Sequence, residues 1–428
     1  MKFGPVRTEP GVERSHMWAL VYAAFATMGL VTGIAVLTPY LLTATLGIDE
    51  AHQGKALGAL TLVNELTLIA VYGPLGALSD RFGRRAIYAA GMLAMAAAYA
   101  LYPQAETLAE LSLYRIVYAA GVGAATGMLA TVVADYAVEG DRGKLVALTG
   151  ILNGLGIVLT AVLLGKLPSI LVERGYDPAA AGRLTAYVAA VACLVTVAAL
   201  ALGLKPGAPA AARAAKPRLI DQLRVGVAAA RADRTIALGY ASAFVARGDL
   251  AIVGLFTIAW GKLAGIQSGL EPAAALEAGR IPFIVAQSAA LLWPLAVVLV
   301  IDKLRREIAL GICMALGGVG YLAMVFVGDP LSSVSWPLFA LLGIGQISAF
   351  LGAQSLIGKA APEASRGAVI GLFNFSGAVG ILVLSGIGGW LFDAVGPAAP
   401  FAVVGVLNFA VAAACFLFRP APVPEPVS

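Results

Sequence analysis

Four ionisable side chains lie within apolar stretches of the sequence, where charge is unusual. Glu65 follows Asn64 in one stretch, Arg115 lies in a second, and Arg247 and Asp249 share a third. Ionisable groups within a membrane are costly and generally belong to solute, ion or proton pathways. Burial favours the neutral form of a carboxyl group and a nearby cation favours its charged form. We therefore expect a carboxyl group here to exchange a proton, with static buried salt bridges as the alternative.

Arg247 and Asp249 are separated by only one residue. On a helix, this spacing turns the two side chains about 200° apart. They therefore cannot face the same cavity. We expect one to face the cavity and the other a neighbouring helix, and the sequence leaves open which is which.

A second group of side chains could bind a substrate near the middle of the membrane, where two structural repeats meet. Its members are amides and aromatics within apolar stretches, and each could instead form an interhelical hydrogen bond or a packing contact. The candidates are Tyr40, Asn64, Gln287, Trp293, Gln346, Gln354, Phe373 and Asn374.

The composition shows which elements must carry these side chains. Of 428 residues, 60% are hydrophobic and only 12% are charged, whereas soluble proteins carry about 25% charged residues. Such a chain can neither cover a water-facing surface nor remain disordered. A membrane helix needs about 20 apolar residues, so we predict an all-α membrane protein. The predicted spans are residues 17–45, 54–78, 86–103, 108–137, 143–165, 183–204, 235–261, 281–301, 307–328, 334–358, 367–392 and 397–418.

The longest polar interruption, residues 205–234, contains three prolines and seven basic residues. We interpret it as a cytoplasmic linker, with a short amphipathic helix near 218–231, between six-helix bundles at 1–204 and 235–428. Lysine and arginine favour the cytoplasmic side, and this layout places 21 of the 29 there. Both termini are thus predicted to be cytoplasmic. The alanine-rich composition suggests a bacterial inner membrane.

A weak internal repeat supports two similar halves. Four residues around the fifth predicted helix recur 224 positions later around the eleventh, which is the trace that a duplicated six-helix unit leaves. The pairs are Glu139 and Glu363, Arg142 and Arg366, Gly143 and Gly367, and Gly156 and Gly380.

The loop after the second predicted helix reads GALSDRFGRR and contains Gly76, Asp80, Gly83 and Arg84. Its pattern resembles the signature loop of the major facilitator superfamily, and the resemblance in layout covers essentially the whole chain. It implies two six-helix bundles (6+6) related by a pseudo-twofold axis along the membrane normal. It also implies a secondary transporter that works by alternating access.

The same resemblance implies a cytoplasmic gate. Asp80 is expected against the N-terminus of the eleventh helix, near Arg366, where the helix dipole favours a negative charge. Arg84 is expected to pair with an acid at the end of the fourth helix, the place that Asp135 occupies. The alternative is a short basic loop that only fixes the orientation of the chain.

Arg115 and the small residues after it also resemble a superfamily pattern, found on the fourth helix. Gly121 and Gly123 match two of its glycines, and Ala119 replaces the first. In the superfamily this arginine is associated with proton-coupled transport. Structural pairing near the membrane surface is the alternative.

We expect a secondary active transporter that moves a small organic solute, driven by a proton gradient and without a cofactor. A proton-driven exporter of multidrug or lipophilic compounds is the alternative, because two carboxyl groups and two arginines within the spans leave the charge of the substrate open. In a different class, a receptor or scaffold with a transporter fold would bind a ligand without moving it.

Enzymatic and nucleic-acid functions are not expected. The only two histidines, His16 and His52, lie outside the predicted spans, and the sequence has no metal-ligand, nucleophile or Walker pattern. The net charge of +5 is explained by basic cytoplasmic loops. The expected partners are the lipid bilayer and a small-molecule substrate, and the chain is expected to act as a monomer.

Overall fold

The structure is a computed structural model that describes residues 2–49, 52–206, 219–295, 304–362 and 365–417. Within these ranges, the side chains of some helical residues, including Asp80 and Arg366, are not described. Twelve helices in the described chain are long and apolar enough to cross a membrane. The prediction of an all-α membrane protein with twelve spans is therefore confirmed.

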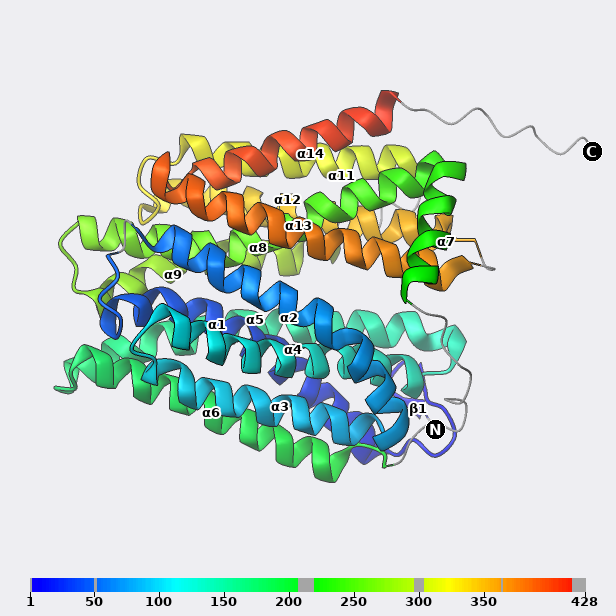
Figure 1. Cartoon of the computed structure of the whole chain (residues 1–428), viewed down its shortest axis with the longest axis horizontal. Helices are drawn as coiled ribbons and strands as arrows, with labels where there is room; N and C mark the ends of the chain where they lie inside the picture. Colours follow the sequence, from blue (N-terminus) through cyan, green and yellow to red (C-terminus); the bar gives the residue numbers. More distant parts are fainter. Residues whose placement is uncertain (1, 50–51, 207–218, 296–303, 363–364, 418–428) are drawn as a thin grey trace, which may run out of the picture.

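Six long helices form the first group, which we call the N half (Figure 1). Each satisfies its backbone hydrogen bonds internally, as hydrocarbon requires. Asp177 accepts a hydrogen bond from the backbone at the start of α6, and Thr107 does so for α4. The helices are α1 (Arg14–Ala44), α2 (Gln53–Phe82), α3 (Arg84–Leu101), α4 (Leu108–Tyr136), α5 (Arg142–Glu173) and α6 (Pro178–Gly203).

The second group, the C half, lies beside the first in the same view (Figure 1). Its long helices are α8 (Arg234–Gln267), α9 (Pro272–Leu292), α11 (Arg306–Leu322), α12 (Trp336–Ala360), α13 (Arg366–Ala394) and α14 (Ala399–Leu417). The short helix α7 (Leu219–Ala232) precedes α8, close to the range expected for an amphipathic helix. Short 3-10 turns occur at Tyr102–Gln104, Glu139–Asp141, Ala323–Phe326 and Ser333–Ser335.

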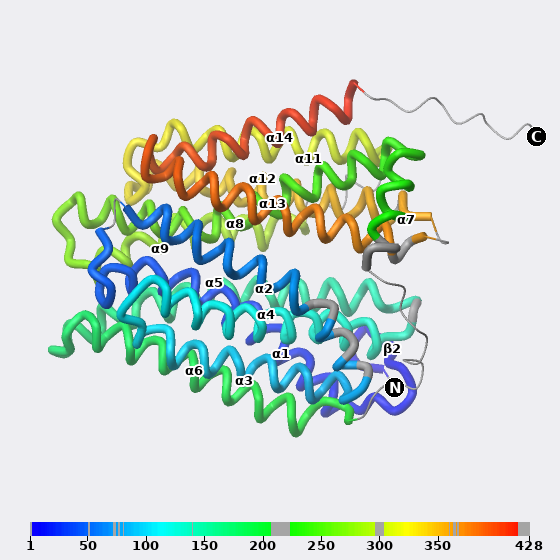
Figure 2. The backbone as a smooth tube through the Cα atoms, in the orientation of Figure 1, coloured from blue at the N-terminus to red at the C-terminus, as the bar shows by residue number. Residues whose placement is uncertain are grey.

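The two ends of the bundle differ. We call the end that carries the N-terminus and α7 the basic end, and the end that carries the start of α2 the far end (Figure 2). The loop from Arg81 to Arg85 lies at the basic end, where α2 stops and α3 begins. Gly83 separates these helices with a φ of 90°, a conformation that glycine adopts without steric cost.

The same helix crossing occurs in both halves. In the N half, a β-carbon on Gly156 of α5 would overlap the carbonyl oxygen of Phe25 on α1. In the C half, a β-carbon on Gly380 of α13 would overlap the carbonyl oxygen of Phe244 on α8. Small residues allow membrane helices to approach this closely. Gly156 and Gly380 are a pair of the sequence repeat, so that repeat corresponds to a repeated packing contact.

Residues before α1 form a folded segment that the sequence did not predict. Strands β1 (Lys2–Phe3) and β2 (Val6–Arg7) make an antiparallel hairpin at the basic end. Arg7 donates backbone and side-chain hydrogen bonds to Asp141 Oδ2, at 2.9 and 2.7 Å. Its guanidinium holds the pKa of the Asp141 carboxyl well below its usual range. The hairpin thereby binds the connection between α4 and α5.

The eighth span begins earlier than predicted. Helix α9 starts at Pro272, whereas the apolar pattern placed its start at 281. Glu277 and Arg280 interrupt that pattern, although both belong to the helix. Their charge is compatible with the helix because Glu277 Oε1 lies 3.7 Å from Lys166 Nζ and from Arg280 Nη2.

Candidate transport pathway and gates

Three of the four intramembrane charged residues interact with one another, two from the N half and one from the C half. Glu65 on α2 is 7% exposed and accepts a hydrogen bond from Asn64 Nδ2 at 3.0 Å. Arg115 on α4 and Arg247 on α8 both act on Glu65 electrostatically. We call Glu65, Arg115 and Arg247 the charged trio. It combines one carboxyl group with two guanidinium groups and draws on both halves of the molecule.

Arg247 is held by α13. Its Nη2 donates a hydrogen bond to Asn374 Oδ1 at 2.8 Å, and Asn374 is exposed. A β-carbon on Gly377, one turn further along α13, would overlap the Arg247 side chain. The missing side chain at Gly377 therefore leaves room for the guanidinium, which lies partly exposed beside a polar amide.

Arg115 is buried within the N half. Only 7% of the residue is exposed, and its guanidinium carbon lies 5.1 Å from the centre of the Tyr118 ring. A cation over an aromatic face is stabilised by the electron-rich ring. Arg115 therefore faces the interior of the helix bundle of the N half.

Asp249 is separate from the charged trio. It is fully buried inside the C half, where Asn408 of α14 and Tyr321 of α11 interact with it. Arg247 on the opposite side of α8 points to Asn374. The two residues thus diverge as their spacing requires, and the structure assigns Asp249 to the helix-packing side.

Several candidate substrate residues connect helices instead of standing alone. Gln287 Nε2 and Gln346 Oε1 lie 3.5 Å apart, and the Trp293 indole donates to Ser348 Oγ at 2.8 Å. Both contacts join α9 to α12. Gln354 is half-buried on α12. The first two contacts therefore hold helices of the C half together.

Two other candidates are packing residues. Tyr40 is fully buried, and its hydroxyl donates to the carbonyl of Pro178 at the start of α6, at 2.8 Å. Phe373 is 1% exposed and belongs to the hydrophobic core of the C half. Their placement inside the halves favours the packing interpretation over substrate contact.

At the far end, α13 supplies a carboxylate to the beginning of α2. Asp393 accepts hydrogen bonds from the backbone N–H groups of Gly54 and Lys55, at 2.7 and 2.8 Å. Free N–H groups and the helix dipole make a helix N-terminus favourable for an anion. Gly54 also lies against the Gly389 backbone. A C-half residue thus caps an N-half helix.

Lys262 makes a second contact between the halves at the far end. This residue of α8 is fully buried, and its Nζ donates to the carbonyl of Pro39 at 2.8 Å and to Thr43 Oγ1 at 2.6 Å. Together with the contacts of Asp393 and the ion pair between Lys166 and Glu277, it forms what we call the far-end interface.

The sequence did not identify the far-end interface. The predicted spans end at 261 and begin at 281, which leaves Lys262 and Arg280 just outside them, yet both residues are buried within helices. One signal was available, because Asp393, Lys262 and Arg280 each lie directly beside an end of a predicted apolar run. Charges at those positions do not distinguish a solvated helix end from a contact between halves.

At the basic end, Arg84 makes the expected contact with Asp135. The two atoms Nε and Oδ2 are 3.4 Å apart, and Arg84 Nη1 donates to Ser79 Oγ at 2.6 Å. The expected contact between Asp80 and the helix start at Arg366 involves side chains outside the described part of the structure, as does Gly76. The arginine thus connects the ends of α2 and α4.

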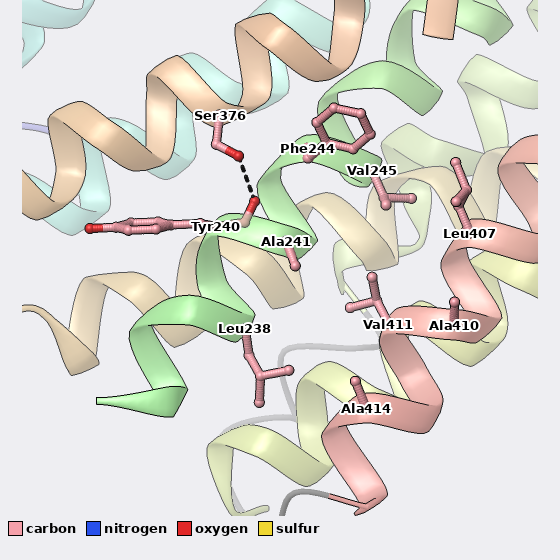
Figure 3. Close-up of a pocket in the computed structure, with 10 residues that line it drawn as sticks. All are labelled: Leu238, Tyr240, Ala241, Phe244, Val245, Ser376, Leu407, Ala410, Val411 and Ala414. Atoms are coloured by element: carbon pink, nitrogen blue, oxygen red, sulfur yellow. Dashed lines mark hydrogen bonds between the residues drawn. The ribbon is translucent and has the colours of Figure 1, made fainter. Parts of the chain in front are cut away.

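A groove of about 490 Å³ lies between α8, α13 and α14 (Figure 3). Its lining is mostly aliphatic and aromatic, including Phe244, Leu407 and Val411. Ser376 Oγ donates to the carbonyl of Tyr240 at 2.8 Å, which satisfies the hydroxyl. The lining contains no member of the charged trio, so this groove is separate from the place where Glu65, Arg115 and Arg247 lie.

Two magnetosome proteins are similar to this sequence over most of its length. The sequence is 28% identical to Magnetosome protein MamH of Paramagnetospirillum magneticum, over 92% of this chain and 90% of that protein. It is 27% identical to Magnetosome protein MamZ of Magnetospirillum gryphiswaldense, over 93% of this chain but only 61% of MamZ. A Vibrio anguillarum Tetracycline resistance protein, class G, is 31% identical over 42% of this chain and 44% of that protein.

Solved transporter structures share the fold. The structure superimposes on the nucleoside transporter NupG (D323A mutant) with a TM-score of 0.73, over 94% of this chain and 99% of NupG, at 14% identity. A POT family transporter in complex with 5-aminolevulinic acid gives a TM-score of 0.67 at 14% identity, over 94% of this chain and 95% of that chain. The family model for the Major Facilitator Superfamily matches residues 20–384 and 278–428. This chain is therefore a member of the Major Facilitator Superfamily of membrane transporters, not an enzyme.

Proposed function

We propose that this chain is a secondary active transporter that couples proton movement to transport of a small organic anion. The observation that carries the proposal is the separation of Asp249 from the other intramembrane charges. Without Asp249, the remaining intramembrane charges are those of the charged trio, which has one carboxyl group and two guanidinium groups. Its net charge is positive whether Glu65 is charged or neutral, which favours an anionic substrate over a cationic one.

Proton coupling would act through Glu65. When Glu65 binds a proton, Arg115 and Arg247 lose their counter-charge and attract the substrate anion. When Glu65 releases the proton, its carboxylate competes with the substrate for Arg247. One proton and one anion would then move in the same direction, which is symport.

Alternating access would use the contacts at the two ends. The far-end interface closes one side through Asp393 and Lys262, while Arg84 and Asp135 belong to the gate at the basic end. Because arginine and lysine favour the cytoplasmic side, we place the basic end in the cytoplasm. Asp80 and Arg366 remain proposed members of that gate.

The test uses purified protein in proteoliposomes. A panel of organic anions, neutral solutes and lipophilic cations is first screened for thermal stabilisation, with and without a step in pH. We expect anions to stabilise the protein and to enter the vesicles faster under an imposed pH gradient. Glu65→Gln should remove the response to the gradient, while Glu65→Asp, which retains a titratable group, should keep part of it.

Three outcomes would contradict the proposal. Selective stabilisation by lipophilic cations would favour the exporter, and stabilisation without flux would favour a receptor or scaffold. Gradient-driven uptake that Glu65→Gln leaves unchanged would exclude this residue from coupling. The relatives' names place them in magnetosomes, so fractionation of native membranes should compare that compartment with the inner membrane that we propose.

A further inference from the structure

The groove between α8, α13 and α14 has a mostly apolar interior. Among the described residues that line it, only Tyr240 and Ser376 carry polar side chains, and none is charged. Both hydroxyl groups are already bonded within the protein. Ser376 donates to the Tyr240 carbonyl, and the Tyr240 hydroxyl donates to the carbonyl of Gly226 on α7 at 3.1 Å. The groove therefore suits an apolar chain, because a polar solute would lose hydrogen bonds to water without replacing them.

The groove lies on the side of the C half that faces lipid. Helix α14 is at the edge of the molecule opposite the N half, and it separates from α13 toward the basic end (Figure 1). It packs mainly against α11 and α8. The lining residues Ala241 and Ala410 are exposed, as are Val406 and Phe409 on α14. Lipid tails are as apolar as such side chains, so the opening of the groove contacts the hydrocarbon of the bilayer.

A positive charge lies beyond the basic end of the groove. Leu238, Ala241 and Val245 line the groove from α8. Residues three and four positions apart share one face of a helix, so these three side chains form a single row. Arg234 comes four residues before Leu238 on the same face and is exposed. The apolar row thus leads toward a guanidinium group at the start of α8.

Helix α7 brings further arginines to this end. The hydrogen bond from Tyr240 to Gly226 holds α7 against a residue of the groove lining. Arg224 and Arg231 are exposed on α7. The described side chains from position 223 to 234 include one acid, Asp233, which accepts a hydrogen bond from the backbone at the start of α8. This end of the groove therefore carries a net positive charge.

We propose that the groove binds an acyl chain of one anionic phospholipid, whose headgroup lies against Arg234 and the arginines of α7. Basic clusters beside membrane helices attract anionic lipids of the cytoplasmic leaflet, the side on which we place the basic end. A lipophilic cation would be repelled by these arginines, and a neutral phospholipid would gain little from them. The lipid would fill the space that α14 leaves as it separates from α13. The site is separate from the charged trio and does not depend on the proposed proton coupling.

The experiment measures lipid binding to the whole protein in an uncharged detergent. Phosphatidylglycerol and phosphatidylcholine with identical acyl chains are added separately. Native mass spectrometry counts the retained lipids, and thermal unfolding gives the apparent affinity, since a ligand of the folded state raises the melting temperature in a saturable manner. We expect one tightly retained phosphatidylglycerol, bound at least tenfold more tightly than phosphatidylcholine. Arg234→Gln should weaken phosphatidylglycerol binding about fivefold and leave phosphatidylcholine binding unchanged.

Substitutions within the groove test the position of the acyl chain. Ala410→Trp fills the groove from α14, and Ala241→Phe fills it from α8, so one can replace the other if either variant does not fold. Both should abolish retention of the tightly bound lipid. Ala413→Trp is the matched control, because Ala413 is exposed on α14 outside the groove lining, and it should retain the lipid.

Three results would overturn the proposal. Equal affinities of the unmodified protein for the two phospholipids would show that the arginines do not select an anionic headgroup. Retention of phosphatidylglycerol by both groove-filling variants would place the lipid elsewhere. Tighter binding of tetraphenylphosphonium, lost in Ala410→Trp, would instead make the groove a site for lipophilic cations.

Discussion

The carboxylate of Asp393 on α13 accepts hydrogen bonds from the backbone N–H groups of Gly54 and Lys55 at the start of α2. Helix caps normally come from the residue just before the helix. Here the capping residue belongs to the other half of the molecule. A conformational change that separates α2 from α13 must therefore expose both N–H groups, which links helix capping to closure of the far end.

Removal of this cap should open the far end. Hydrogen bonds to a charged group contribute about 1.5–3 kcal/mol, and water recovers part of that when the interface separates. We expect Asp393→Ala to increase the open population about tenfold, which corresponds to about 1.4 kcal/mol. The measurement is the labelling rate of Ser385→Cys, a buried position on α13 beside Gly58, with a membrane-impermeant maleimide.

Asp177→Ala is the control for this prediction. Asp177 caps α6 with similar chemistry, but within the N half. Its replacement should lower thermal stability without changing the labelling rate. Equal labelling in the Asp393 and Asp177 variants would mean that the contact with Gly54 does not control closure.

The repeated glycine crossing predicts a matched pair of stability effects. Gly156→Ala and Gly380→Ala should each destabilise the protein, because the added carbon overlaps a carbonyl oxygen of the facing helix. Overpacking of this kind costs about 1–3 kcal/mol. Gly150→Ala and Gly386→Ala lie on the same two helices with open space at the β-carbon, so they should be neutral or stabilising. Thermal unfolding of the four variants in one detergent tests the comparison, and equal melting temperatures would contradict it.

The membrane helices could be predicted because each contains a long and mostly apolar run, a local property of the sequence, whereas the start of α9 was missed where Glu277 and Arg280 interrupt that pattern. The contacts of Lys262 and Asp393 could not, because a charge at a helix end looks the same whether it meets water or another helix. The hairpin around Arg7 is a similar case, since its stability depends on Asp141, far away in the sequence. The spacing of Arg247 and Asp249 required their side chains to point in different directions. Which of the two is buried inside the C half depends on tertiary packing, and the sequence does not show this.

The hairpin should remain bound in moderately acidic solution. Arg7 lowers the pKa of Asp141, so the stabilisation is fully present above the unfolded pKa of about 3.9 and is lost only as pH falls through the lower folded value. Protection of residues 2–12 from proteolysis should therefore be constant from about pH 7 to pH 5. Asp141→Asn should expose the segment throughout this range, while Glu9→Gln, a carboxyl-to-amide change within the same segment, should not. Loss of protection in the unmodified protein between pH 7 and 5 would contradict the role of Asp141.

The two lysines of the far-end interface should differ strongly in effect. Lys262 is fully buried and donates to Pro39 and Thr43, whereas the Lys166 side chain is 53% exposed and lies 3.7 Å from Glu277. Exposed ion pairs contribute little, while hydrogen bonds from a buried charge contribute more. We expect Lys262→Met to increase Ser385→Cys labelling several-fold and Lys166→Met to leave it nearly unchanged. If both variants label alike, burial of Lys262 between the halves is not what keeps the far end closed.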